Sequence, residues 1–220
     1  PELIWWQGLN FDYTNGEDFG LDTRLFWWPT DPLRITAGFN SFSLSVPIRA
    51  RARGITADSA YVDVLYLESD LREYGAAVGT QWFSDDNVYI AGTARYDQNV
   101  YLTPDLKVRG GFALGFGTYS KQDVDYYSPQ YEWSALLTSA IQWVNHIRYE
   151  KKWMSAVYLR AGVSGEYDYS IYPVAGITFE QSYVHSKTFN ITGNVSYDLR
   201  VYDGDYTNVV GAYVTLNWYF

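Results

Sequence analysis

The sequence predicts an all-β fold, an antiparallel up-and-down transmembrane β-barrel of about twelve strands. Apolar and polar side chains alternate over segments of ten or more residues, and helical periodicity is weak. Aromatic residues make up 19% of the 220 residues, yet the mean hydropathy is only -0.25. A barrel turns every second side chain toward lipid, so its average hydropathy conceals the membrane. Tryptophans also lie near the ends of the segments, as an aromatic girdle requires.

A soluble β-sandwich would show the same local alternation. Sandwich strands, however, have about five to six residues, whereas a tilted strand needs about nine to eleven to cross a bilayer. The alternating segments here have the longer length, and this favours the membrane barrel.

The first six segments each carry an apolar and a polar stripe. In chain order the apolar positions are Leu3, Trp5, Leu9 and Phe11; Leu21, Leu25 and Trp27; Leu33, Ile35, Ala37 and Phe39; Val62, Val64 and Tyr66; Tyr74, Ala76, Val78 and Trp82; and Val88, Ile90, Ala94 and Tyr96. The polar stripe includes Asp12, Asp22, Arg24, Arg34, Asp63, Glu73, Arg95 and Asp97.

The last six segments repeat the pattern. Their apolar positions are Leu106, Val108, Phe112, Leu114 and Phe116; Trp133, Ala135, Leu137, Ile141 and Trp143; Val157, Leu159, Ala161 and Val163; Ile171, Ala175, Ile177 and Phe179; Phe189, Ile191, Val195, Tyr197, Leu199 and Val201; and Ala212, Val214, Leu216, Trp218 and Phe220. The polar stripe includes Lys107, Arg109, Glu132, Arg160, Glu180, Asp198 and Arg200.

The connections between these segments predict an orientation. Bacterial barrels keep short turns and both termini in the periplasm and long loops outside. If Phe220 is periplasmic, the outer loops are 13–18, 43–57, 83–87, 118–130, 165–170 and 202–206, and the inner turns are 29–32, 67–72, 98–105, 148–152 and 185–187. The two longest connections both fall outside, which supports the strand count. Trp5, Trp6, Trp27, Trp28, Trp143, Trp153 and Trp218 would then lie near the periplasmic rim.

Composition excludes several classes of function. The absence of cysteine excludes disulfides, thiol catalysis and Cys-ligated metals. A net charge of -9 argues against nucleic acid, which needs clustered Lys and Arg. The two histidines, His146 and His185, lie at the periplasmic ends of different segments, so we expect no catalytic triad. We therefore expect no enzyme, no cofactor and no metal site, and a single domain over residues 1–220 that begins as a mature or trimmed chain.

Two interpretations of the charged polar stripe remain open. Opposite charges across a narrow lumen can simply pair with each other. Alternatively, they and the inward tyrosines line a wet conduit and contact a passing solute.

Several loop segments carry a resemblance to a known family. They are Val46–Ala50 with Gly54–Ser59, Arg72-Glu73-Tyr74, Trp82-Phe83-Ser84-Asp85-Asp86-Asn87, and Asp123-Val-Asp125-Tyr126-Tyr127-Ser128-Pro129. In this order they resemble the C-terminal barrel of outer-membrane poly-β-1,6-N-acetylglucosamine (PNAG) export porins, which are related to cellulose-type exporters. The resemblance covers about residues 33–220.

The resemblance implies a monomeric bacterial outer-membrane porin that exports partly deacetylated PNAG, a polycation, into the biofilm matrix. It implies a periplasmic tetratricopeptide region or a deacetylase as partner. That family's barrel has more than twelve strands, so the chain is interpreted as a C-terminal piece or a shortened relative. Two rival functions stay open: a passive porin for small solutes, and a closed structural barrel with partner-binding loops.

For a polycationic sugar, the expected contacts are carboxylates and aromatic rings. We expect lumen contacts from Asp63, Asp97, Glu132, Glu180 and Asp198, exit contacts from Asp123 and Asp125, and sugar stacking on Tyr61 and Tyr158. The loop at 43–57 is expected to fold inward as a constriction. Its alternating Arg49, Arg51 and Arg53 would face one side of an extended segment and pair with Asp63, Asp97 and Glu132.

Overall fold

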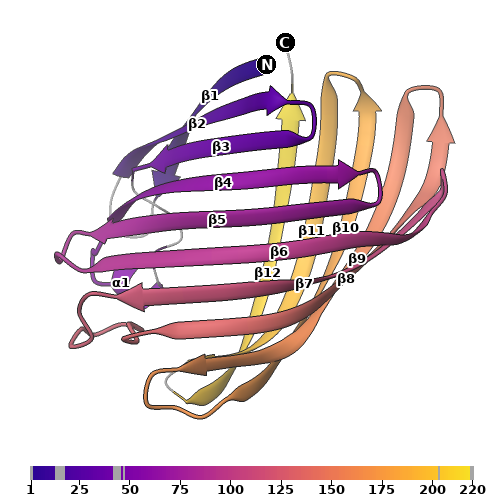
Figure 1. The fold of residues 1–220 in the computed structure, drawn as a ribbon. Helices are drawn as coiled ribbons and strands as arrows, with labels where there is room; N and C mark the ends of the chain where they lie inside the picture. The colour runs from indigo at the N-terminus through magenta and orange to yellow at the C-terminus, as the bar shows by residue number, and fades with distance from the viewer. Residues whose placement is uncertain (1, 13–17, 42–45, 47, 203, 219–220) are drawn as a thin grey trace. The chain divides into compact units, whose positions relative to one another are not determined.

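A computed structural model describes residues 2–12, 18–41, 46, 48–202 and 204–218 as one twelve-stranded sheet, in which strands adjacent in the chain are hydrogen-bonded neighbours (Figure 1). The elements are β1 (Glu2–Asp12), β2 (Asp18–Thr30), β3 (Leu33–Asn40), α1 (Ile48–Arg51), β4 (Ala57–Ser69), β5 (Arg72–Phe83), β6 (Val88–Leu102), β7 (Leu106–Tyr119), β8 (Glu132–Arg148), β9 (Lys151–Glu166), β10 (Tyr172–Ser186), β11 (Phe189–Tyr202) and β12 (Asp205–Trp218). Within the described residues, no helix combines the length and apolar character that crossing a bilayer requires.

The strands belong to two compact units. Unit 1 comprises Pro1–Tyr96, Leu114–Ser134 and Gly165–Ser170, and unit 2 comprises Asp97–Ala113, Ala135–Ser164 and Ile171–Phe220.

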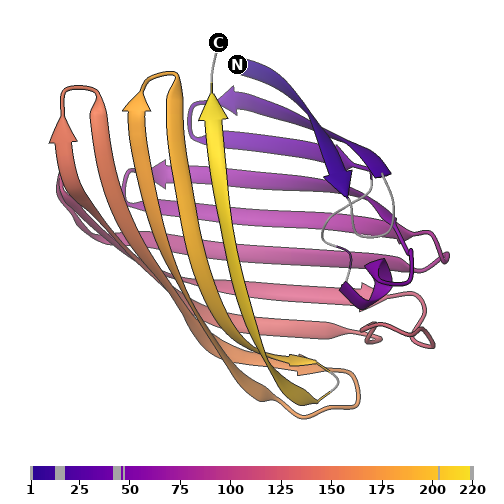
Figure 2. The same cartoon turned by 180° about the vertical axis from the view of Figure 1, so that it is seen from behind.

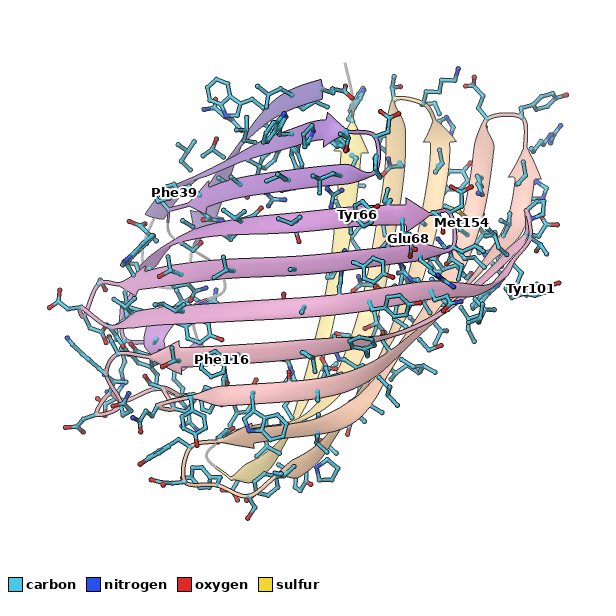
Figure 3. The ribbon with its side chains drawn as sticks, in the orientation of Figure 1. Phe39, Tyr66, Glu68, Tyr101, Phe116 and Met154 are labelled. Carbon is cyan, nitrogen blue, oxygen red and sulfur yellow. The ribbon has the colours of Figure 1, made fainter. Side chains whose placement is uncertain are left out.

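In unit 1, the register fixes which side chains share a face. Ile35 of β3 pairs with Trp27 of β2 and Val64 of β4, and the next residue, Thr36, pairs with Phe26 and Asp63. Alternate residues therefore form an apolar face and a polar face, as the sequence predicted. Figure 3 marks Phe39, Tyr66 and Phe116, three exposed side chains of the apolar face, on β3, β4 and β7.

In unit 2, the antiparallel register runs without interruption from β9 to β12, apart from one shift near Val184. Its apolar side chains are exposed: Leu137, Val210 and Val214 have 72%, 72% and 71% of their surface accessible. Apolar surface on this scale needs a non-aqueous partner, since soluble monomers rarely expose large apolar patches. The alternation therefore leaves one face of the sheet apolar and exposed, as a lipid-facing sheet requires.

The predicted strands and connections agree with the structure, with differences of a few residues. All five inner turns are shorter than expected, because the strands extend into them; β6, for example, continues to Leu102 and β9 already begins at Lys151. The predicted outer loop at 202–206 is shorter than expected, since Tyr202 at the end of β11 pairs with Asp205 at the start of β12. The predicted loop 13–18 lies mostly outside the described residues.

The structure shows which face Trp6 and Trp28 occupy, while their place near the periplasmic rim stays a prediction. Trp6 pairs with Arg24 in the register of β1 and β2, and the Arg24 guanidinium lies 4.9 Å from the Trp6 ring centroid. Trp28 stacks on Phe26 at 6.1 Å between ring centroids. Both rings lie on the polar face, because consecutive tryptophans in a strand must point to opposite sides.

Candidate functional site

Most acidic side chains on the polar face of unit 1 are paired with arginine. The Arg24 guanidinium lies 2.8 Å from Asp22, Arg34 lies 3.7 Å from Asp63, and Arg95 lies 3.5 Å from Glu73. Of the predicted lumen residues, Asp63 thus has an arginine partner on a neighbouring strand. Here the structure favours charge pairing over a free acidic lining.

Glu132, at the start of β8, is held by tyrosines instead. Tyr89 of β6 donates to Glu132 Oε1 at 2.7 Å, and Tyr127 lies 2.8 Å from Glu132 Oε2. The Tyr127 hydroxyl is also 2.9 Å from Glu166 Oε1 at the end of β9. Two carboxylates from adjacent strands therefore meet one phenol at the long-loop end of the strands.

Tyr127 belongs to the loop between β7 and β8, and its surroundings keep it neutral. Burial raises the pKa of its hydroxyl, and the negative charge of Glu132 raises it further. Tyr127 and Glu166 were not among the predicted site residues. Sequence spacing could not link them to Glu132, because the contact depends on how the loop folds.

In unit 2, Glu180 of β10 has a similar environment. Tyr158 of β9 donates to Glu180 Oε1 at 3.2 Å, and Gln142 of β8 donates to the Tyr158 hydroxyl at 3.1 Å. Glu180 also lines a cavity of about 360 Å³ with Lys107, Gln142, Lys152, Met154 and Ser182. The predicted residues Tyr158 and Glu180 are thus brought together beside a space that can admit a ligand.

The other two predicted acids of unit 2 are paired with arginine. Asp198 of β11 accepts from Arg160 Nε at 2.8 Å and lies 3.4 Å from Arg200, while Asp97 lies 3.8 Å from Arg109. Arg160 reaches Asp198 across β10 directly over Gly176, which pairs with both residues. A Cβ at Gly176 would overlap Asp198 Oδ1 and lie 2.5 Å from Arg160 Nε, so this pair requires glycine there.

Three sequence segments that carry the family resemblance assemble at the long-loop end of unit 1. We define the outer loop cluster as residues 46, 48–56, 84–87 and 120–131. Its buried side chains Val46, Ala50 and Tyr126 pack against Ala57, Phe83 and Tyr119 of the strands. Ile55, Tyr89 and Val124 are partly buried against the same group. Figure 2 shows α1 of this cluster in front of the strands, and Figure 1 shows it behind them. The cluster therefore covers one face of the sheet, the polar one.

Asn87 holds the outer loop cluster together. Its side chain is fully buried. Its Nδ2 lies within 3.2 Å of Lys121 O, Tyr126 Oη and Ser128 Oγ, and its Oδ1 accepts from the backbone of Val88 and Lys121. A buried amide with this many partners fixes two loops in one arrangement.

The prediction for Arg49, Arg51 and Arg53 was wrong in its geometry. Residues Ile48–Arg51 form a short helix, so the three arginines do not share one side of an extended segment. Arg53 pairs with Asp125 of the neighbouring loop, not with a lumen carboxylate. The helix forms because Ala50, at 0% exposure, packs into the apolar cluster. A constriction by these residues remains a prediction.

The remaining predicted site residues lie in different surroundings. Asp123 and Asp125 are exposed in the loop between β7 and β8. The ring of Tyr61 lies on Gly38 of the neighbouring strand, where a Cβ would overlap it. Tyr61 therefore covers backbone of its own sheet, although it is only partly buried.

Comparisons with known proteins match this chain to one family. A family model described as the PgaA membrane beta barrel domain matches residues 8–220. Two relatives from Escherichia coli, strain K12 and O157:H7, are each 25% identical over 187 residues and are both described as poly-beta-1,6-N-acetyl-D-glucosamine export protein. The match covers 83% of this chain and 23% of each relative, so the chain spans less than a quarter of their length.

A solved structure shows the same fold. It is described as a bacterial polysaccharide outer membrane secretin, and it superposes with a TM-score of 0.86 at 20% sequence identity. The superposition covers 95% of this chain and 72% of the other.

Proposed function

The chain belongs to the family of PgaA membrane β-barrel domains, and from this premise we propose that it translocates a partly deacetylated β-1,6-linked N-acetylglucosamine polymer across the bacterial outer membrane. In this role the polar face of the strands is the path of the polymer. The proposal assigns transport, and no reaction, to this chain.

The observation that carries the proposal is the contrast between two kinds of carboxylate. Asp63, Asp97 and Asp198 each have an arginine partner, which is close at Asp198 and lies at 3.7 Å and 3.8 Å from Asp63 and Asp97. Glu132 and Glu180 instead accept hydrogen bonds from tyrosines, and no cationic side chain of the described residues forms an ion pair with either. Neutral donors hold these carboxylates in place and leave their negative charge available.

An acidic group beside tyrosines suits a sugar that carries amines. The ammonium of a deacetylated glucosamine can approach the carboxylate, while the apolar face of a sugar ring stacks on a phenol ring. Each attraction at a solvated site is modest and falls with ionic strength. Conduction needs such weak, repeated sites, because binding must permit both entry and release.

The relatives' much greater length supports a further part of the proposal. We assign this chain the membrane-crossing step alone, and we assign delivery of the polymer to a periplasmic tetratricopeptide region or a deacetylase. A pull-down of the refolded chain against each of these partners would test this division of roles.

One observation favours a second candidate, a barrel that is closed at its outer end. The outer loop cluster covers the polar face of unit 1 with well-packed apolar side chains and a fully buried Asn87. A closed barrel would show no ion conductance in a planar bilayer, whereas a translocation path would show discrete channels. Channels that prefer anions would favour a passive porin.

The test measures how long oligoglucosamine blocks the current through single channels. It compares the wild-type chain with variants at the two tyrosine-held carboxylates, Glu132 and Glu180. Glu132→Gln and Glu180→Gln, separately and together, should shorten the blockades, with the double variant shortened at least threefold. The matched control is Glu68→Gln, since Glu68 also accepts from a tyrosine, Tyr74 at 3.0 Å, but lies at a short turn on the apolar side. Equal blockade in all variants would contradict the proposal.

A further inference from the structure

At the short-turn end of the strands, two adjacent hairpins of unit 2 carry a net positive charge. Residues 148–152 and 186–188 contain Arg148, Lys151, Lys152 and Lys187, with Glu150 as their single acid. Lys187 lies 3.9 Å from Glu150, which places the β8–β9 and β10–β11 turns side by side, as Figure 1 also shows. Over the same window the other short turns are neutral or acidic: Asp31 is balanced by Arg34, Asp105 by Lys107, and Glu68 and Asp70 outweigh Arg72.

These cations are accessible to a ligand. The Lys187 side chain is 87% exposed, and its contact with Glu150 is at the limit of an ion pair. Arg148 and Lys151 are exposed as well, and the Arg148 guanidinium lies 6.0 Å from the ring centroid of Tyr149, which is 92% exposed. In a chain with a net charge of -9, a basic rim of this kind indicates an anionic partner.

A group of hydrogen-bonding side chains lies next to this rim on the apolar face. Ser155 Oγ accepts from Asn145 Nδ2 at 2.6 Å and from Gln181 Nε2 at 2.8 Å, and the indole of Trp153 donates to Gln181 Oε1. Farther along the same stripe the side chains are Val157, Leu159 and Ala161 of β9, and Phe179 and Ile177 of β10. Polar groups thus interrupt the lipid-facing stripe at the level of Trp153.

Aromatic side chains mark this level as the membrane interface. Tyr183 and His185 of β10 have ring centroids 6.1 Å apart, His185 lies 6.4 Å from Phe189, and Phe189 lies 6.2 Å from Trp218. Tyrosine and tryptophan favour the headgroup region of a bilayer, because their rings are apolar and their hydrogen-bonding groups are polar. The basic rim therefore lies at headgroup depth, with the amide and hydroxyl groups just inside it.

We propose that this surface, formed by Arg148, Lys151, Lys187, Asn145 and Gln181, binds the headgroup of an anionic phospholipid in the periplasm-facing leaflet. The cations attract the phosphate, as basic clusters beside membrane-spanning segments do. The amides of Asn145 and Gln181, which the buried Ser155 hydroxyl holds in place, offer hydrogen bonds to the glycerol and ester oxygens, and the apolar stripe contacts the acyl chains. A soluble acidic protein would use the cations alone, whereas the polar groups lie on the lipid-facing side.

Lipid retention in native mass spectrometry tests the proposal. The full chain, refolded in detergent, is incubated with phosphatidylglycerol or phosphatidylcholine of identical acyl chains. The wild-type chain should retain phosphatidylglycerol at least fivefold better, and Lys151→Gln with Lys187→Gln should remove most of this preference. Gln181→Leu keeps every charge and should cause a smaller loss.

Arg72→Gln is the matched control, since Arg72 lies at a short turn that also carries Glu68 and Asp70, and it should leave the preference unchanged. Heat-modifiable migration in gels checks that each variant is folded. Equal retention of the two lipids by the wild-type chain overturns the proposal, as does a preference that survives both the double lysine change and Gln181→Leu. Salt-sensitive binding of polyglutamate without any lipid preference would point to an acidic protein instead, and would equally overturn it.

Discussion

At the scale of single residues, Gly176 determines whether a buried carboxylate on the polar face keeps its partner. Asp198 is 4% exposed and is compensated by Arg160, which crosses β10 where Gly176 has no side chain. An uncompensated buried charge is costly. Because glycine at position 176 lacks even the methyl group of alanine, Arg160 can reach Asp198 and compensate its charge.

Gly176→Ala should therefore lower the free energy of unfolding by about 1–2 kcal/mol, since the pair must separate or shift. Urea titration of the refolded chain in lipid vesicles measures this. Gly193→Ala is the control, because its added Cβ meets only ordinary contacts, the nearest being Val214 Cγ2 at 3.7 Å. Equal stability of the two variants would show that the pair does not depend on Gly176.

Tyr126 makes the outer loop cluster sensitive to alkaline pH. Burial raises the pKa of Tyr126 to about 12 from its ordinary 10.0, and its hydrogen bond to Asp85 raises it while the one from Asn87 lowers it. The folded cluster thus favours the neutral phenol. This stabilisation is fully present below pH 10.0 and is lost as the pH rises through about 12.

The rate of tryptic cleavage after Arg53 or Lys121, measured in short exposures at each pH, should therefore increase between pH 10 and pH 12. Tyr126→Phe cannot ionise at this position and should show a smaller change over the same range. A pH response that is identical in the two proteins would assign the effect to another group.

At the scale of elements, the alternation of each strand could be predicted because its cause is local. A strand crossing lipid must place an apolar side chain at every second position, and this pattern marked most strand boundaries to within a few residues. Where Trp6 follows Trp5, alternation places a large aromatic ring on the polar face, since only one of two consecutive residues can face lipid. It could not predict α1, because Arg49, Arg51 and Arg53 alternate like a strand while Ala50 is fixed by distant residues.

The candidate site shows the same division between local and distant causes. Positions such as Glu132 and Glu180 follow from alternation along one strand. Their partners do not, since Tyr89 is 43 residues from Glu132 and Tyr158 is 22 residues from Glu180. The register between strands decides which carboxylates lie beside an arginine. That register cannot be derived from a single sequence.

The lipid-facing assignment can be tested strand by strand. Leu159→Arg, near the middle of β9, should destabilise the folded chain in lipid by about 2–4 kcal/mol. Leu216→Arg should destabilise it by less, because Leu216 lies closer to the end of β12. Thr215→Arg places the same charge on the polar face of β12 and should fold normally. Folding yield in lipid vesicles, read from heat-modifiable migration, provides the measurement. Equal yields for all three variants would contradict the membrane assignment.

At the scale of the whole molecule, the central claim is that the polar face contacts a cationic sugar polymer. In this proposal arginine-paired acids stabilise the strands, whereas the tyrosine-held carboxylates Glu132 and Glu180 attract the solute. The apolar face contacts lipid, and the basic rim of unit 2 contacts its headgroups. These surfaces carry different charges, so each can be examined without disturbing the others.

The most direct measurement compares two blockers of the wild-type chain in a planar bilayer. One is a fully deacetylated β-1,6-glucosamine oligomer and the other is its N-acetylated counterpart of the same length. We predict that the deacetylated oligomer blocks the current for longer at low salt, and that the difference shrinks as ionic strength rises. Equal blockade by the two oligomers at every salt concentration, or a channel that prefers anions, would contradict the account.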